Sequence, residues 1–296
     1  MKILICTDGL PAADQAVHLG ATIAAACTAE VTLLGVVENP GEADQIMDAL
    51  RRGRQWFEER KIHAEVVTVT GPAVEEIVKR TEATPFDLVV IGAAKKGSSG
   101  LFWRSSKTYT IIKRIDPPVL VAMEKSATIK RVLICSGGKK DMQPALALAG
   151  RLVRGLGAGV TLFHVLPDAP ALFEELRREE VDASVLLSSK SLLGRTLNSQ
   201  NLALESAGVP VEVKLRQGPV QDEIIDEVQS GAYDLVVAGS APGRGGLHTY
   251  ILGNVTREIV NRAECGVLVV RTSARPVGFM RSVSGWLKRD RSTPAE

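Results

Sequence analysis

The sequence predicts an α/β protein built from two tandem doubly wound domains, each with a five-stranded parallel sheet flanked by helices. The first observation behind this prediction is an internal repeat. Residues 2–20 (KILICTDGLPAADQAVHLG) align with residues 131–149 (RVLICSGGKKDMQPALALA), so that Ile5 matches Ile134 at an offset of 129. The second observation is that short runs rich in Val, Ile and Leu alternate with longer stretches of helical period. This alternation is typical of a parallel sheet covered on both faces.

Five apolar runs recur in the same order in both copies, and each is expected to be a strand. Helices are expected between them, with Pro11 and Pro72 in first turns, where a missing amide hydrogen is tolerated. By Gly71 and Gly218 the offset between the copies has grown from 129 to 147, so the second copy carries 18 extra residues within 167–209, which are expected to lengthen one helical region. The expected strands are 2–7, 31–37, 64–69, 87–91 and 118–123 in the first copy, and 131–135, 159–165, 210–216, 234–238 and 266–271 in the second.

Length and composition agree with two globular domains and a tail. A chain of 296 residues with 45% hydrophobic residues is long enough for two cores. The first domain is expected at 1–126, the second at 129–272 and a basic amphipathic tail at 273–296. The net charge of +2 arises in this tail, and the nearly neutral remainder gives no argument for nucleic-acid binding.

The sequence predicts a cytoplasmic protein with reduced cysteines. No apolar run approaches the roughly 20 residues of a membrane helix, and Asp8 comes too early for a signal peptide. The cysteines lie far apart, without a Cys-x-x-Cys pair, so they are interpreted as core thiols rather than as disulfide or zinc ligands. They are Cys6, Cys27, Cys135 and Cys265.

A glycine-rich segment, GSAPGRGGLHTYILGNVTREIV, follows the fourth strand of the second copy. Gly239 and Gly243 allow backbone amides to approach a ligand closely. Nine residues later, Gly253 and Asn254 open a helix whose free N–H groups would face the same place. These features predict a phosphate cradle at the carboxyl ends of the strands, where doubly wound sheets bind ligands.

With this loop, the repeated chain resembles a tandem universal stress protein, over about residues 1–272. Domains of that family typically carry Gly, two residues, Gly, nine residues and then Gly-Ser/Thr at this place. The second copy has one extra residue in the first gap and Asn254 in place of Ser or Thr, although an Asn amide still donates hydrogen bonds. The resemblance implies an adenine nucleotide such as ATP, with or without Mg²⁺, as the ligand.

The first copy keeps the same loop in a partial form, GAAKKGSSGLFWRSSKTYTII. Gly92 and Gly97 stand in the first two places, and Lys107-Thr108 replaces Gly-Ser/Thr. Lys107 brings a β-carbon where the family brings backbone close, yet its ammonium is able to meet a phosphate as a point charge.

The resemblance also assigns the adenosine end of each site. ATP-binding members place an acidic residue after the first strand and offer backbone groups from the end of the second strand to the adenine. Asp8 matches the acid in the first copy, and Gly137 has lost it in the second. Val36 and Val165 occupy the second-strand position. Each copy therefore keeps a different half of the pattern, and the second is favoured because backbone amides and a helix terminus supply most phosphate affinity.

In the family, the fifth strand commonly pairs with its counterpart across a dimer. The resemblance therefore implies that residues 119–123 pair with residues 267–271, so that the two copies form an intramolecular pseudo-dimer and cover two open sheet edges. Further assembly into a homodimer is left open.

Two other functions compete with nucleotide binding. Ser136-Gly137-Gly138 resembles the start of the Ser-Gly-Gly-any-Asp-Ser loop of ATP pyrophosphatases, but Asp141 comes one residue late and Met142 replaces the second Ser. A turn feeding a helix capped near Asp141 is favoured instead. No nucleophile or general base is evident, so any ATP hydrolysis is expected to be slow and incidental.

The remaining alternative is a scaffold without nucleotide, which Lys107 and Gly137 favour. In this alternative, an unidentified protein partner or an anionic membrane surface would bind to the insert or the tail, and the membrane contact would be weak. The tail carries apolar residues at helical spacing and a basic opposite face, but packing on its own domain or partial disorder is favoured.

Overall fold

The structure is a computed structural model that describes residues 1–93, 106–123, 128–138, 142–167, 182–242 and 250–272. The tail at 273–296, Gly97, Gly243 and Asp141 lie outside these residues. Within the described part of the chain, no helix combines the length and apolar character that crossing a bilayer requires.

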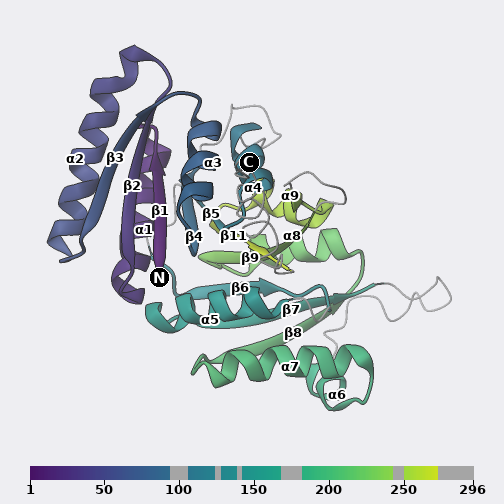
Figure 1. Ribbon diagram of the computed structural model, residues 1–296. Coiled ribbons are helices and arrows are strands. Elements are labelled where there is room, and N and C mark those ends of the chain that lie inside the picture. The colour runs from purple at the N-terminus through teal and green to yellow at the C-terminus, as the bar shows by residue number, and fades with distance from the viewer. Residues whose placement is uncertain (94–105, 124–127, 139–141, 168–181, 243–249, 273–296) are drawn as a thin grey trace, which may run out of the picture.

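The strands of both copies form one continuous sheet in the order β3-β2-β1-β4-β5-β11-β9-β6-β7-β8 (Figure 1). The first copy, purple to blue in Figure 1, contributes its half with every strand pair parallel. Its chain moves outward from β1 to β2 and β3, then returns to place β4 on the other side of β1. The first-copy strands are β1 (Lys2–Thr7), β2 (Glu30–Val37), β3 (Ala64–Thr70), β4 (Leu88–Gly92) and β5 (Val119–Ala122).

The second copy repeats this arrangement with the same internal strand order. A short additional strand, β10, pairs antiparallel with the end of β9 and lies off the main path. The described strands begin and end within one or two residues of the predicted ones, except that β9 extends to Pro242. They are β6 (Arg131–Cys135), β7 (Gly159–Leu166), β8 (Val211–Gln217), β9 (Leu235–Pro242), β10 (Tyr250–Ile251) and β11 (Gly266–Arg271).

The two copies join through β5 and β11, which run antiparallel with Val121 opposite Val267 and Val119 opposite Val269. This pairing confirms the intramolecular pseudo-dimer. It places two buried strands, which would otherwise be open edges, in the middle of the sheet.

Helices cover both faces of the sheet, and each face carries one core shared by the two copies. β1 shows why both faces are filled: Ile3 and Ile5 contact the core under α1, α2, α5 and α7, whereas Leu4 points to the core under α3, α4, α8 and α9. The helices are α1 (Pro11–Cys27), α2 (Ala43–Glu59), α3 (Ala73–Ala83), α4 (Ser106–Arg114), α5 (Gln143–Leu156), α6 (Ala183–Ser188), α7 (Leu192–Ser206), α8 (Val220–Ser230) and α9 (Asn254–Arg262), with a short 3₁₀ helix η1 (Pro40–Glu42).

Helix starts agree in part with the sequence. Pro11 is the first residue of α1, as predicted, whereas Pro72 is the residue just before α3.

The insert of the second copy does not lengthen α7, whose 15 residues are fewer than the 17 of its counterpart α2. Instead, the short helix α6 precedes it. Ser191 separates the two helices because its hydroxyl accepts the Gly194 N–H and caps α7.

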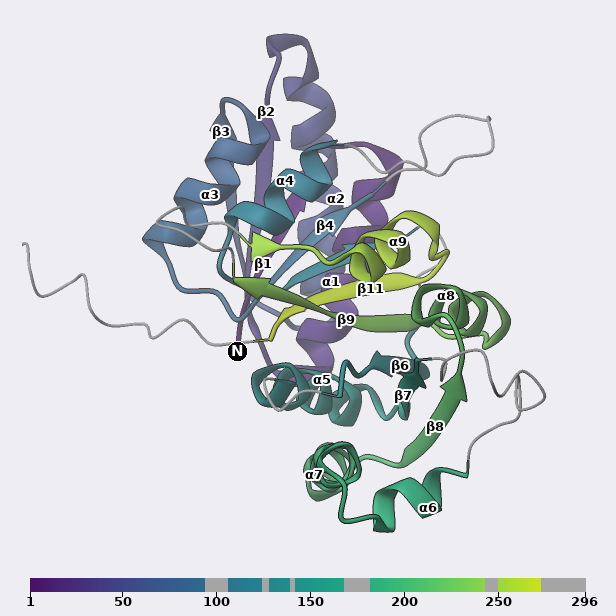
Figure 2. The same ribbon diagram turned by 90° about the vertical axis from the view of Figure 1, so that its right-hand side faces the viewer.

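Arg271 at the end of β11 reaches across to the first copy and covers the C-terminal end of α4. Its guanidinium donates to the carbonyls of Ile112, Ile115 and Pro117 at 2.9, 2.6 and 3.1 Å. It also donates to Ser240 Oγ in the second copy at 2.9 Å. Figure 2 shows α4 and α9 above β9 and β11. The buried guanidinium of Arg271 joins the C-terminal end of α4 to β11.

Candidate functional site

A pocket of about 300 Å³ lies at the carboxyl ends of the first-copy strands. Because the chain reverses its direction of travel between β1 and β4, this is the switch point at which doubly wound sheets bind ligands. Residues from β1, β2 and β4, the turn after β1, and helices α1 to α4 line it. The set is Cys6, Thr7, Asp8, Leu10, Ala13, Val36, Glu38, Glu42, Gln45, Ala73, Ile77, Ile91, Gly92, Lys107, Thr108 and Ile111.

The turn after β1 presents Asp8 to this pocket. Gly9 has φ of +77°, a left-handed conformation that favours glycine. Its N–H donates to Thr7 Oγ1 at 3.1 Å, and the Leu10 N–H donates to Asp8 Oδ1 at 3.0 Å. These two bonds fix the exposed carboxylate of Asp8 just ahead of α1.

The other first-copy residues assigned from the sequence converge on the same pocket. Val36 is buried at the end of β2, Thr108 is buried in the first turn of α4, and Gly92 ends β4. A β-carbon at Gly92 would lie 2.3 Å from the carbonyl oxygen of Ala12. Close packing of β4 against the first turn of α1 therefore requires glycine here.

Glu38, which the sequence did not single out, follows β2 and contacts the first turns of α3 and α4. Its Oε1 accepts the Ala73 N–H at 2.9 Å, at the N-terminus of α3. Its Oε2 forms an ion pair and hydrogen bond with the Lys107 ammonium. The bond from Lys107, with that from Ala73, holds the pKa of Glu38 below its usual value of 4.5. Lys107, expected to meet a phosphate, thus has a carboxylate partner.

In the second copy, Gly253 is the N-cap of α9, and Asn254 is the first residue of that helix. Among the described residues, no atom lies within 4 Å of a β-carbon built at Gly253, so none of them crowds its backbone. Gly239 packs against the side chain of Thr272. A β-carbon at Gly239 would lie 2.5 Å from Thr272 Cγ2. Val165 is buried near the end of β7.

The Ser-Gly-Gly turn of the second copy is anchored to α7. Ser136 is buried, and its hydroxyl donates to Gln200 Oε1 at 2.7 Å and accepts the Gly138 N–H at 3.1 Å. His164 is buried, and its Nδ1 lies 2.7 Å from the Ser136 carbonyl oxygen, so this histidine is a hydrogen-bonded core residue. These contacts favour a structural turn over a pyrophosphatase loop.

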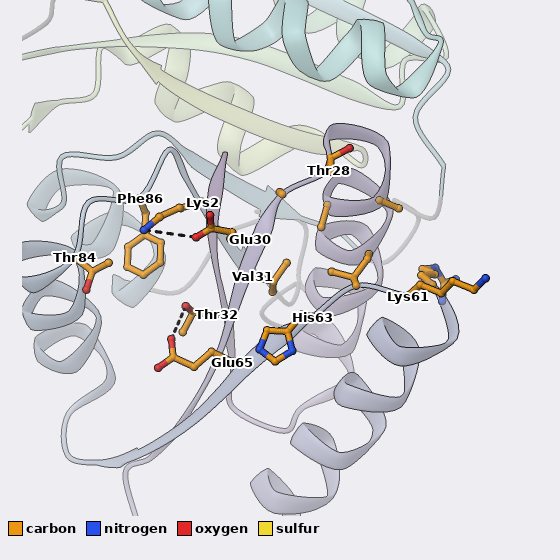
Figure 3. A pocket seen from close by; sticks show the side chains of 15 residues that line it. Lys2, Thr28, Glu30, Val31, Thr32, Lys61, His63, Glu65, Thr84 and Phe86 are labelled. Carbon is orange, nitrogen blue, oxygen red and sulfur yellow. Dashed lines mark hydrogen bonds and ion pairs between the residues drawn. The ribbon is translucent and has the colours of Figure 1, made fainter.

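A larger hollow of about 650 Å³ lies at the opposite, amino end of the first-copy strands (Figure 3). Its carboxylates are engaged within the protein: Glu30 pairs with Lys2 at 3.5 Å, and Glu65 accepts from Thr32 at 3.1 Å. Lys61 points away from the hollow in Figure 3. The hollow therefore presents no convergent set of unpaired groups of one charge.

Comparison with known proteins identifies the family. The model described as the universal stress protein family matches residues 1–122 and again residues 128–271. The chain belongs to the universal stress protein family. The two matches correspond to the two copies, so this is a tandem member.

Relatives of the universal stress protein differ in length. A protein of Staphylococcus aureus (strain USA300) named as a universal stress protein is 28% identical over 162 residues, which cover 53% of this chain and 93% of the relative. A universal stress protein structure from Archaeoglobus fulgidus covers 92% of this chain and 98% of its own, with a TM-score of 0.70 and 18% identity. One from Pseudomonas aeruginosa covers 91% and 92%, with a TM-score of 0.62 and 14% identity. These structures share the fold of this tandem universal stress protein.

Proposed function

We propose that this universal stress protein is a cytoplasmic regulatory module of the stress response that binds an adenine nucleotide in its first copy. The observation that carries the proposal is convergence. Asp8, Val36, Gly92 and Thr108 come from four separate segments, and all of them line one pocket.

The adenosine end of the pocket has suitable chemistry. Val36, Ile77 and Ile111 supply apolar surface for a base, and the fixed carboxylate of Asp8 is an acceptor for ribose hydroxyls. The volume of about 300 Å³ falls at the lower end of the range of roughly 300–1,000 Å³ for small-molecule sites. Among the described residues, no group of three or more His, Cys, Asp or Glu side chains is placed to hold a metal ion, so Mg²⁺ would arrive with the nucleotide.

The second copy is proposed as a weaker site. The backbone at Gly253, which no described residue crowds, and the helix start at Asn254 suit a phosphate, but Gly137 offers no carboxylate for the ribose. Binding without turnover is proposed for both copies. The free cysteines agree with a reducing compartment such as the cytoplasm.

Isothermal titration of ATP, with and without Mg²⁺, into nucleotide-stripped protein tests the proposal. Asp8→Ala should weaken binding at one site by about tenfold, since it removes the acceptor for the ribose hydroxyls. Gly137→Ala is the matched control in the second copy, because its added β-carbon meets no atom within 4 Å.

No heat and no thermal stabilisation of the wild type at millimolar ATP would contradict nucleotide binding and favour the scaffold. Equal affinity in both variants would contradict the assignment to the first copy.

A further inference from the structure

The carboxylate of Glu38 engages two groups in the first-copy pocket that are of the kind that binds anions. It accepts the N–H of Ala73 at the start of α3 and pairs with the ammonium of Lys107 at the start of α4. Helix N-termini and ammonium groups are the usual partners of phosphate groups in proteins. Here both are already engaged by a side chain of the protein.

The other charged residues of the pocket make the Glu38–Lys107 pair important for the binding of phosphate groups. Among its described lining residues, Lys107 is the only cation, whereas Asp8, Glu38 and Glu42 are carboxylates. A nucleotide that brings phosphates into the pocket therefore adds negative charge to a wall that is already acidic. Among the described lining residues, it gains a cationic partner only when Lys107 leaves Glu38.

Both residues of this pair are replaced in the second copy. Glu38 matches Pro167 at the offset of 129, and Lys107, the second residue of α4, matches Val255, the second residue of α9. Proline has no carboxylate and valine has no ammonium, so the second copy cannot form the pair. The ion pair therefore distinguishes the first-copy pocket from its repeat.

We infer that Glu38 is an internal competitor for the phosphate groups of the ligand, so that the first-copy pocket discriminates adenine ligands by their phosphate charge. This inference rests on the proposed function and adds a rule of specificity to it. Adenosine enters without disturbing the pair, whereas AMP and ATP bind by taking Lys107 from Glu38.

Partial exposure makes the competition reversible. The side chains of Glu38 and Lys107 are 28% and 55% exposed, so solvent screens their attraction and a phosphate is able to displace the carboxylate. The low pKa of Glu38 agrees with this geometry, because the carboxylate stays charged throughout the neutral range.

The test compares adenosine, AMP and ATP on the full chain by isothermal titration. In Glu38→Gln the amide oxygen still accepts the Ala73 N–H, but the charge that holds Lys107 is removed. The matched control is Glu75→Gln, which breaks another ion pair of α4, that of Arg114 with Glu75 of α3, outside the pocket. Melting temperatures of both variants check that the fold is retained.

We expect Glu38→Gln to tighten AMP and ATP binding by about tenfold and to leave adenosine within about twofold of the wild type. Glu75→Gln should leave all three affinities within about twofold. Adding Lys107→Met to Glu38→Gln should abolish the gain, because the released ammonium is its source. Binding by Glu38→Gln of an AMP that the wild type does not bind would also support the inference.

Unchanged AMP and ATP affinities in Glu38→Gln, with binding intact, would overturn the inference while the proposed function stands. An equal gain for adenosine would do the same, because it would show a general opening of the pocket. If no variant bound any of the three ligands, the proposed function and this inference would both be wrong.

Discussion

The guanidinium carbon of Arg271 lies 3.8 Å from the centre of the Tyr250 ring. Arg271 therefore stacks on an aromatic ring of its own copy while it donates to the end of α4 in the other copy. Tyr250 completes the contact, because its hydroxyl donates to Asp116 Oδ1 at 3.1 Å. One buried side chain thus fastens the two copies on the face of the sheet that carries α4 and α9.

Replacing this arginine should weaken the whole fold. Arg271→Met introduces the residue that the first copy carries at the matching place, Met123, and removes the guanidinium that donates to the carbonyls of Ile112, Ile115 and Pro117. Buried acceptors left without partners should lower the free energy of unfolding by about 3 kcal/mol. Urea denaturation followed by circular dichroism measures this change.

The matched control is Arg262→Met at the exposed last residue of α9. Its free energy of unfolding should stay within about 0.5 kcal/mol of the wild type. Equal losses in the two variants would show that the carbonyl contacts of Arg271 contribute nothing specific.

Gly92, the last residue of β4, and Gly239, within β9, should differ in their tolerance of alanine. In Gly92→Ala the new β-carbon would meet the backbone of Ala12, which cannot move without shifting α1. In Gly239→Ala it would meet only the side chain of Thr272. We expect losses of about 3 and about 1 kcal/mol respectively in the free energy of unfolding. The reverse order in thermal or urea denaturation would contradict the packing at Gly92.

The thiol of Cys6 should be unreactive in the folded protein. Burial raises its pKa from 9.0 to about 12, which lowers the thiolate fraction at pH 8 roughly a thousandfold. Cys27 is half-buried, and burial raises its pKa as well. Mass spectrometry after iodoacetamide treatment at pH 8 should show Cys27 modified well before Cys6, and all four cysteines modified alike in urea. Fast modification of native Cys6 would contradict its burial.

Tyr233 should make stability fall at alkaline pH. Burial, with its hydrogen bond to Glu227, raises the pKa of Tyr233 from 10.0 to about 12. Because the folded-state pKa is the higher one, this stabilisation is complete below about pH 10 and is lost between about pH 10 and 12. The variant Tyr233→Phe, which matches Phe86 of the first copy, should lose about 1 kcal/mol at pH 8 but show a smaller fall up to pH 11. Parallel alkaline profiles of urea denaturation would contradict this assignment.

The strands and their order of repetition could be predicted because their signals are local and occur twice. Each strand is a run of branched apolar residues, and the second copy confirms the period of the first. The pairing of β5 with β11 was also predicted, from the resemblance to a family in which this strand forms a dimer contact. The convergence of Asp8, Val36, Gly92 and Thr108 likewise follows from that family motif.

Side-chain contacts that belong to no family motif could not be predicted. Glu38 and Lys107 are 69 residues apart, and neither the period of a strand nor that of a helix relates them. In the sequence, Arg271 is the last residue of an apolar strand, and nothing in the pattern around it indicates a contact with α4. Ser136 and Gln200 are 64 residues apart, and no strand or helix period relates them either.

The seam between β5 and β11 has a consequence for how the protein behaves in a mixture. Separate chains that met through such a seam would come apart on dilution and exchange subunits with related chains. Here the two strands belong to one molecule, so the effective concentration of each for the other is set by the chain itself. Every molecule therefore carries one pocket with Glu38 and one loop with Gly137, in a ratio that neither expression level nor competing relatives can alter.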